Sequence, residues 1–464
     1  MVSVSVPKKW DHEADVVVVG AGTAGLPAAW VVADAGLKAV VLELLPYLNP
    51  SLSLINVGPA FAGTDVQKEQ GINDSPEEYY KDGVELAKGD PSLWRAFVDN
   101  QLETYYWCQQ IGMGFGKDLF APPGHRIKRG IWKKGPEMTR TLEKAAKEKG
   151  VEIKVSHRAR RLIVDPLTGR VIGVKVKVKD EEQNFKARKA VILGTGGFGR
   201  NPELVAEFGP YFSNWLPTMS HGHLGDGLIM AMDQGAATSQ ISHAVSGSFA
   251  VDVDSKSGIM DFVGYAGGLF VNINGKRFAD EGMRLKFYGL VTEEGMKQPE
   301  HVWFGIVDDK MMKTTLRPQM MHKAKPVKAD SLEGLAELMG INPAGLRATV
   351  DKYNHDLDTL GYDSEFDRRT QEGCEGTPIK LETAPFYGYK CTGATSSFKG
   401  GLKINAKAQV INQYGETIPG LYAAGEVTGG LWGHGGTYLP CTMVSASLTF
   451  GRIAAQNAIK DPSW

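Results

Sequence analysis

Cysteine is scarce in this chain, and its few cysteines are widely spaced. They are Cys108, Cys374, Cys391 and Cys441, and no pair of them has the CxxC spacing or another spacing typical of metal ligands. This pattern argues against a structural zinc site. We therefore expect no bound metal and a reducing compartment.

The chain also lacks an excess of charge of one sign and has no long apolar run. Its 52 lysines and arginines against 53 acidic residues leave a formal net charge of −1, so no global positive field attracts nucleic acid or an anionic membrane. Residues 1–15 contain no apolar signal core, and no later segment approaches the roughly 20 apolar residues of a membrane span. We expect a cytoplasmic protein that neither binds nucleic acid nor spans a membrane.

Glycine, by contrast, is abundant. The chain has 464 residues with 42% hydrophobic and 23% charged residues, which is ordinary globular usage and room for two large domains or about three smaller ones. Its 56 glycines make up about 12% of the chain, against about 7% in average proteins. The glycine clusters are therefore the first places to look for a functional site.

The first glycine cluster lies in a complete dinucleotide-binding pattern. Residues 15–19 predict a buried parallel strand, residues 26–35 a helix, and residues 38–43 a second strand that ends in Glu43. Between strand and helix lies Gly-Ala-Gly-Thr-Ala-Gly, in which Gly20 permits a tight turn, Gly22 lets the backbone approach a pyrophosphate, and Gly25 allows close packing. Glu43 follows Gly20 at the distance expected of an acid that binds a ribose.

Two further strands open into glycines, at residues 189–199 and 418–426. Neither is followed by the helix and acid of a second dinucleotide site, so a separate site for a nicotinamide cofactor is not visible. One cofactor that spans several distant segments fits FAD better than NAD.

With these segments in place, the sequence resembles the fumarate reductase/3-ketosteroid dehydrogenase family of FAD-dependent oxidoreductases. The resemblance extends over most of the chain. It rests on Ala-Gly-Thr-Asp at 62–65, the segments 71–78, 90–91, 139–150 and 169–174, Trp107, Gly-Thr-Gly-Gly-Phe-Gly at 194–199, Gly-Asp-Gly at 225–227, Gly-Lys-Arg-Phe-Ala-Asp-Glu at 275–281, Gly-Gly-Leu at 400–402, and the block 420–457.

The resemblance implies an α/β fold: a doubly wound, Rossmann-like FAD-binding domain built from residues 1–219 and 381–464, with an α+β cap domain inserted at 220–380. It implies FAD contacts from residues at both ends of the chain. These are Gly20, Ala21, Gly22, Thr23, Ala24, Gly25, Glu43, Ala159, Thr195, Gly196, Gly197, Asp226, Glu426, Met443 and Val444. Residues 44–65 contain no histidine for covalent attachment, so we expect FAD to be bound noncovalently.

Members of this family add or remove two hydrogens across a carbon–carbon bond, and a side chain opposite the flavin handles the proton. The resemblance places that residue just beyond residues 277–281, where Arg284 and Tyr288 flank the family position without falling on it. Arg284 is equally explained as an arginine paired with a nearby acid. Tyr288 is the marginal favourite, although a tyrosine needs a lowered pKa or a relay to act as a base.

The carboxylate clamp of fumarate reductases is missing. Ser396 and Ser397 occupy the place of the family's substrate histidine, and the register of its substrate arginine falls on Tyr438. Without a bidentate arginine, fumarate and succinate are poor substrate candidates. His221 and His223 lie near another family histidine but out of register, which favours a structural role.

Residues 433–440, Gly-His-Gly-Gly-Thr-Tyr-Leu-Pro, resemble instead the segment in which ketosteroid dehydrogenases carry a tyrosine that binds the substrate ketone. By that resemblance the Tyr438 hydroxyl donates to a carbonyl oxygen and stabilises an enolate. The alternative is an ordinary packed tyrosine. His434 and Trp432 are weaker candidates that could line the pocket.

The leading hypothesis is therefore an FAD enzyme that desaturates a cyclic or steroid-like ketone next to its carbonyl, or reduces the corresponding enone. An enoate reductase that acts on an unsaturated monocarboxylate is the alternative. A flavin-containing electron-transfer subunit without substrate chemistry is a third interpretation. The expected partners are a small-molecule substrate and an electron donor or acceptor that the sequence does not identify.

Overall fold

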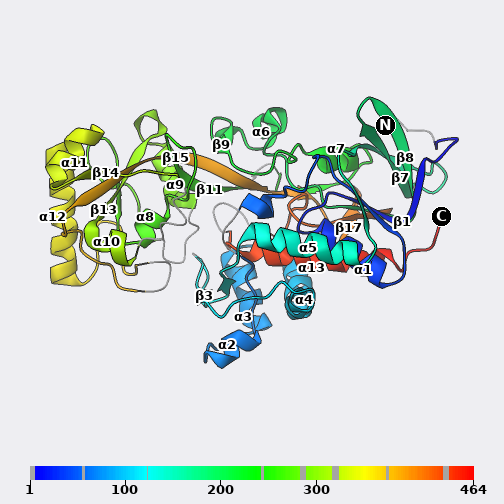
Figure 1. Ribbon diagram of the computed structural model, residues 1–464, viewed down its shortest axis with the longest axis horizontal. Coiled ribbons are helices and arrows are strands. Elements are labelled where there is room, and N and C mark those ends of the chain that lie inside the picture. The colour runs from blue at the N-terminus through cyan, green and yellow to red at the C-terminus, as the bar shows by residue number, and fades with distance from the viewer. Residues whose placement is uncertain are drawn as a thin grey trace.

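The protein is elongated, with a larger lobe that contains both ends of the chain and a smaller lobe built from the middle of the chain (Figure 1). The computed structural model describes residues 6–54, 58–122, 124–241, 245–282, 289–315, 323–371, 376–431 and 438–464. The α/β fold class predicted from the sequence is confirmed by the two lobes and by the sheet in each.

The larger lobe is organised around an eight-stranded sheet in which strands far apart in sequence are neighbours. The central order is β17 (Gln409–Ile411), β18 (Thr417–Ala423), β8 (Glu181–Leu193), β1 (His12–Val19), β2 (Ala39–Leu42) and β5 (Glu152–Lys154), and β6 (Arg158–Val164) and β7 (Val171–Val178) extend it from β8. β1 pairs in parallel with β2 and β8, so Val17 lies between Val40 and Val191. These side chains are fully buried, which explains why β1 reads as a continuous apolar run.

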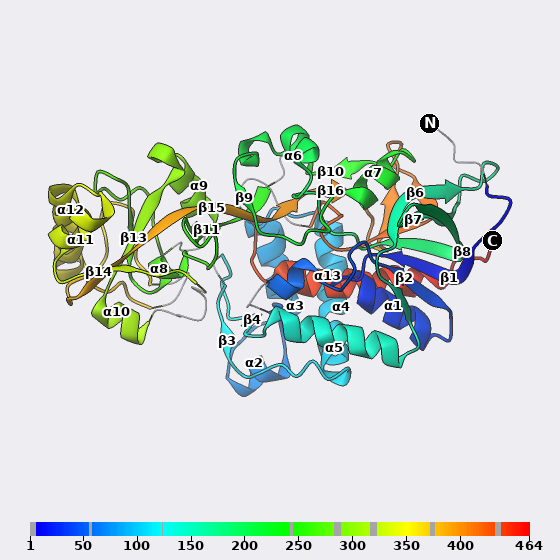
Figure 2. The same ribbon diagram turned by 45° about the horizontal axis from the view of Figure 1, so that its top comes forward.

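Helices from both ends of the chain cover one face of this sheet (Figure 2). α1 (Gly25–Asp34) packs against α13 (Thr442–Ala458) and α5 (Gly135–Glu148), and α4 (Pro91–Gln110) packs against α13. The smaller α3 (Pro76–Lys81) packs against α4, and the short α2 (Asp65–Glu69) lies near the lower edge of the view, with β3 (Leu119–Phe120) and β4 (Gly130–Ile131) nearby. The contact between α1 and α13 brings the first glycine loop next to the C-terminal block.

The smaller lobe has its own mixed sheet. β11 (Val245–Asp252), β15 (Phe386–Lys399), β13 (Trp303–Asp308) and β12 (Leu269–Val271) are neighbours in that order, and β14 (Val327–Ala329) and β9 (Leu216–Pro217) also pair with β15. The helices of this lobe are α8 (Phe262–Tyr265), α9 (Gly289–Met296), α10 (Asp309–Thr314), α11 (Leu332–Met339) and α12 (Pro343–Leu360).

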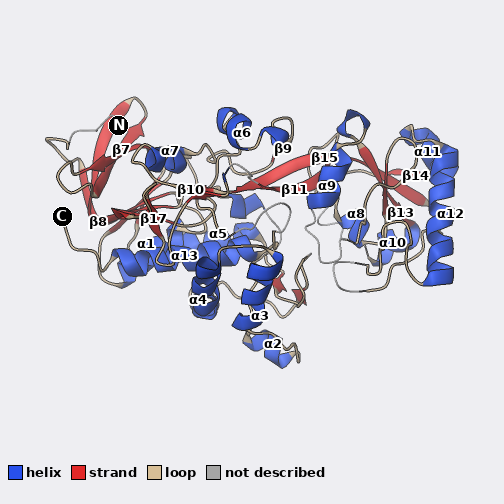
Figure 3. Cartoon of the chain, turned by 180° about the vertical axis from the view of Figure 1, so that it is seen from behind, coloured by secondary structure: helices blue, strands red, loops and turns tan. Residues whose placement is uncertain are grey.

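Long β15 runs from the smaller lobe back to the larger one (Figure 3). It is followed by β16 (Gly401–Leu402), which pairs with β10 (Thr238–Ser239). Two helices, α6 (Pro202–Phe208) and α7 (Asp226–Met232), come before the smaller lobe in the sequence. Strand pairing places β15 in the sheet of the smaller lobe, although β15 lies beyond residue 380, where the predicted cap domain ends. The domain boundaries at 219/220 and 380/381 stay a prediction, and we propose that β15 is shared between cap and FAD-binding domain.

A buried ionic cluster holds the smaller lobe together. The Arg277 guanidinium donates to both carboxylate oxygens of Glu281 at 2.8 and 2.7 Å and to Asp363 at 2.7 Å. Arg368 adds a contact to Glu281 at 3.4 Å, and all four side chains are at most 1% exposed. The Gly-Lys-Arg-Phe-Ala-Asp-Glu motif therefore has a structural task, which is to anchor the chain just before residues 283–288.

None of the helices that the structure describes combines the length and the apolar character that crossing a bilayer requires.

Candidate active site

The first glycine loop is shaped by contacts that only glycine permits. Gly20 has φ +103°, and a Cβ atom there would lie 2.3 Å from the carbonyl oxygen of Gly194. A Cβ atom on Gly25 would lie 1.9 Å from the oxygen of Gly20. At Gly22, by contrast, the nearest atom to such a Cβ is 3.7 Å away, on Pro50. Two glycines thus pack the loop against its surroundings, and the middle one leaves its surface open to a ligand.

Glu43 closes the same loop from the end of β2. Its carboxylate accepts hydrogen bonds from the backbone N–H groups of Ala21, at 3.0 Å, and Leu45, at 2.9 Å. Burial raises the pKa of the Glu43 carboxyl, partly offset by these two hydrogen bonds. Each oxygen uses one acceptor position in these bonds, so each keeps capacity for a ribose hydroxyl.

A cavity of about 490 Å³ runs from this loop to the smaller lobe. All but two of the residues that the sequence predicted for FAD line it. The lining residues in that set are Gly20, Ala21, Gly22, Thr23, Ala24, Glu43, Ala159, Thr195, Gly196, Asp226, Glu426, Met443 and Val444. Gly25 and Gly197 lie behind the wall, and a Cβ atom on Gly197 would lie 2.4 Å from Glu426 Oε1. Their individual roles in binding FAD stay a prediction.

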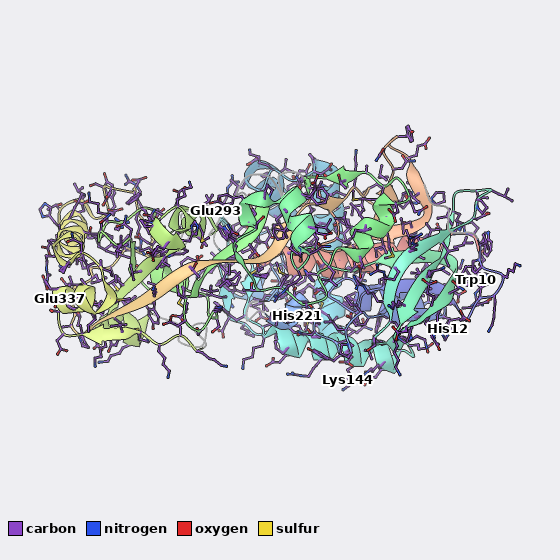
Figure 4. The ribbon with its side chains drawn as sticks, turned by 90° about the horizontal axis from the view of Figure 1, so that it is seen from above. Trp10, His12, Lys144, His221, Glu293 and Glu337 are labelled. Atoms are coloured by element: carbon purple, nitrogen blue, oxygen red, sulfur yellow. The ribbon has the colours of Figure 1, made fainter. Side chains whose placement is uncertain are left out.

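Two groups of charged or polar side chains shape the wall near the loop. Arg158, on β6, donates twice at 2.8 Å to Asp226, the first residue of α7. His223 lines the cavity, with Nε2 3.1 Å from Ser51 Oγ and Nδ1 3.6 Å from Glu426 Oε2. These partners agree with a positioning role for His223. His221 is exposed and does not line the cavity; Figure 4 shows it near the middle of the long axis, between the labelled residues of the two lobes.

The same cavity is lined by the main substrate-binding residue predicted from the sequence. Tyr438 is 8% exposed and lines the cavity together with Ser396 and Ser397. The segment after Tyr438 is held from behind, because His125 Nε2 lies 2.8 Å from the Pro440 oxygen and the Tyr79 hydroxyl 2.7 Å from Thr442 Oγ1. The other predicted residues, Arg284, Tyr288, Trp432 and His434, lie outside the described residues.

Two functional candidates escaped the sequence analysis. One is Lys399, at the end of β15, which is 1% exposed and whose Nζ lies 4.0 Å from the centroid of the Tyr438 ring. Its ammonium group also donates to Ser397 Oγ. Burial lowers the pKa of Lys399 to about 8, although the Glu426 carboxylate opposes this shift. The sequence feature that could have pointed to Lys399 is its position directly before Gly400-Gly401.

The other candidate is Asp261, which lines the cavity from the smaller lobe and is 1% exposed. It accepts hydrogen bonds from the Ala250 N–H at 2.8 Å and from Thr292 Oγ1 at 3.3 Å. Burial raises the pKa of its carboxyl to about 7. A buried carboxyl that holds a proton near neutral pH is suited to proton transfer. Nothing in the sequence around Asp261 indicated that it would be buried.

Comparison with known proteins identifies the family. The model of the FAD binding domain family matches residues 15–438. A fumarate reductase (cytochrome) from Shewanella frigidimarina is 31% identical over 457 residues, which cover 96% of this chain and 77% of the relative. The chain belongs to this family of FAD-binding flavoproteins. Its cofactor is FAD.

Two further relatives of the flavoprotein differ in what their names say they act on. An acrylate reductase flavoprotein subunit from Shewanella woodyi is 28% identical over 482 residues, 97% of this chain and 92% of that one. The structure of a 3-ketosteroid-Δ4-(5α)-dehydrogenase from Rhodococcus jostii, in complex with 4-androstene-3,17-dione, has a TM-score of 0.79 at 25% identity and covers 99% of both chains. All three relatives are consistent with an FAD-dependent oxidoreductase that acts on carbon–carbon bonds.

The cavity fits FAD on its own geometry. The open surface at Gly22, the two acceptor oxygens of Glu43 and the start of α13 at Met443 and Val444 are what a pyrophosphate, a ribose and a flavin ring need. When bound, FAD supplies or accepts a hydride. The chain itself must bind the substrate, exclude water and move the accompanying proton.

We expect Glu43→Ala to weaken FAD retention about 10–100-fold, because a hydrogen bond to a charged acceptor contributes roughly 1.5–3 kcal/mol. Equilibrium dialysis of the refolded protein against FAD measures the change. Glu152→Ala, on the adjacent strand β5 and outside the cavity, is the matched control.

Acid denaturation should release intact FAD from the wild type. Flavin that stays with the precipitate, or purified protein that contains FMN, would contradict noncovalent FAD binding.

Proposed function

We propose that this flavoprotein reduces a carbon–carbon double bond conjugated to a single carboxylate, so that it is an enoate reductase. Support comes from the wall of the cavity, which includes the hydroxyl-bearing residues Ser397 and Tyr438 with Lys399 behind them. No arginine is among the described residues that line the cavity. That composition suits one carboxylate better than two, since a dicarboxylate needs a second charged clamp.

The chemistry explains why hydroxyl donors are useful at this wall. Adding a hydride to the β-carbon of an enoate moves negative charge onto the α-carbon and the carboxylate oxygens. The hydroxyl groups of Ser397 and Tyr438 can donate to those oxygens, and the interaction strengthens as the charge develops. A proton must then reach the α-carbon, and the Asp261 carboxyl, with a pKa raised by burial to about 7, is suited to supply it.

The relatives favour this proposal over the ketone substrate that the sequence analysis preferred. The fumarate and acrylate reductases are named for carboxylates with a conjugated double bond. A cyclic or steroid-like ketone remains the second candidate, and the full-length similarity to the ketosteroid dehydrogenase favours it. Tyr438 is used in both proposals, because both reactions place negative charge on an oxygen next to the reacting carbons.

A substrate panel separates the candidates. With a reduced viologen as electron donor, we expect acrylate or cinnamate to be reduced with a kcat/KM roughly 10–100-fold above that of fumarate, since one missing charged hydrogen bond costs about 1.5–3 kcal/mol. 2-Cyclohexenone is the test compound for the ketone candidate. Fumarate turnover equal to that of the monocarboxylates would contradict the proposal, and a clear preference for 2-cyclohexenone would favour the second candidate.

A further inference from the structure

Lys399 is a buried cation directly behind the wall of the cavity. Its ammonium group donates to Ser397 Oγ, lies 3.8 Å from the sulfur of Met443 and lies 4.0 Å from the centroid of the Tyr438 ring. Ser397, Met443 and Tyr438 all line the cavity, whereas Lys399 does not. Any influence of Lys399 on a bound molecule must therefore act through these three side chains or through its electric field.

The charge on Lys399 is opposed only from beyond ion-pair distance, by the Glu426 carboxylate, within the described residues. Within the part of the chain that the structure describes, no acidic side chain forms an ion pair with Lys399. The opposing carboxylate, Glu426, accepts from the Phe398 N–H at 3.0 Å and lies 3.6 Å from His223 Nδ1. An unpaired buried ammonium group is costly to keep, so a protein that keeps one at a cavity has placed positive potential there.

Ser397 transmits this potential to the cavity. Its hydroxyl oxygen accepts the hydrogen bond from Lys399, so its own proton points elsewhere, and the side chain borders the cavity. A hydroxyl group that accepts from a cation is a stronger donor, because hydrogen bonds in a chain polarise one another. The ammonium group over the Tyr438 ring also holds that ring in place through a cation–π interaction.

We propose that Lys399 is a positioning residue that makes Ser397 and Tyr438 into a binding site for a single oxyanion, whether the carboxylate of an enoate or the enolate oxygen formed from a ketone. The inference rests on the proposed function for the identity of the reacting molecule, but the oxyanion site can be tested without any reaction. If Lys399 only fills space, its replacement changes stability and leaves the affinity for an oxyanion unchanged.

The test uses 4-nitrophenol as a probe, because its anion has a visible absorption band that the neutral form lacks. FAD-loaded protein is titrated with the probe across a pH range, and the apparent pKa of the bound probe is read from this band. We expect Lys399→Met to raise the pKa of the bound phenol by about 1–2 units relative to the wild type, which corresponds to a 10–100-fold weaker preference for the anion. Lys399→Arg should retain most of the wild-type preference.

The pH dependence has a defined sign. The ionisable groups on this side of Lys399 are the Glu426 carboxylate and, beyond it, the His223 imidazole. Because burial lowers the pKa of Lys399 to about 8, its charge is present below that pH and is lost above it. The affinity of the wild type for the anion should therefore fall as the pH rises through about 8, whereas that of Lys399→Arg should not. Lys403→Met removes an exposed lysine four positions further along and is the control that should behave as wild type.

Each outcome decides the proposal. Equal pKa values of bound 4-nitrophenol in the wild type and in Lys399→Met, at equal FAD content, would overturn it, and so would failure of the wild type to bind the anion. If Lys399→Met loses FAD, Ser397→Ala is tested instead. We expect the Ser397→Ala protein to bind the 4-nitrophenol anion about 10-fold more weakly than the wild type, because one donor is lost. Unchanged affinity of this variant would overturn the proposal. Anion binding without reduction of any alkene would contradict the proposed function and leave the oxyanion site standing.

Discussion

Replacing Tyr438 with phenylalanine should slow hydride transfer about 10²–10³-fold, or roughly 2.7–4 kcal/mol, the usual effect of losing one donor to a developing oxyanion. The ring remains and only the hydroxyl is removed, so the cation–π contact with Lys399 at 4.0 Å is preserved. Substrate binding should change less than the rate, because the hydrogen bond strengthens as the charge forms. Anaerobic mixing of reduced protein with substrate, followed by flavin absorbance over a single turnover, measures the effect without an external electron partner.

The matched control for this prediction is Tyr422→Phe. Tyr422 is also buried, and its hydroxyl donates to Asp461 at 3.0 Å, but it lies on β18 and does not line the cavity. Its loss should lower stability by about 1.5–3 kcal/mol, because the acceptor is charged, and leave the rate of hydride transfer unchanged. A well-folded Tyr438→Phe protein that reacts as fast as Tyr422→Phe would show that Tyr438 is a packing residue.

The second large effect is expected at Arg277, whose replacement by methionine should lower the free energy of unfolding by about 3–5 kcal/mol. The substitution leaves Asp363 without its cation, and leaves Glu281 with the longer contact to Arg368 at 3.4 Å and a hydrogen bond from the Phe270 N–H at 3.1 Å. These carboxylates are fully buried, so water cannot replace the lost partner. Urea unfolding followed by tryptophan fluorescence measures the change.

Arg347→Met is the control, because Arg347 makes an equally short bidentate pair with Glu333, at 2.7 and 2.9 Å, but with a side chain that is 42% exposed. An exposed pair contributes about 0–1 kcal/mol, so the control should be nearly as stable as the wild type. Adding Asp363→Asn to Arg277→Met should recover part of the loss, because the remaining buried charge is removed. Equal stability of the two methionine variants would show that the cluster at Arg277 is not an anchor of the smaller lobe.

The nucleotide-binding half could be predicted because its signals are local. The turn at Gly20 requires a positive φ, the strand before it requires β-branched residues, and the acid after β2 lies at a spacing set by one helix and one strand. Such features depend on residues within about 25 positions of one another. The structure accordingly brings the predicted glycines and Glu43 to one cavity.

The substrate end could be predicted only in part. The sequence predicted that the dicarboxylate clamp is missing and that Tyr438 takes its place, but it did not indicate which cation lies there. Tyr438 and Lys399 are 39 positions apart in sequence and come together because β15 ends beside the segment that leads into α13. Such a contact depends on the packing of two lobes and has no periodicity to reveal it.

The glycine pattern thus settled from sequence alone that the chain binds a dinucleotide cofactor, since backbone conformation is encoded by the residues that adopt it. The protonation behaviour of the site was decided by tertiary structure. An aspartate and a lysine are ordinary charged residues in a sequence, and only burial raises the pKa of Asp261 to about 7 and lowers that of Lys399 to about 8. Burial has this effect because removing a charge from water costs free energy, and that cost depends on every element that packs around the group.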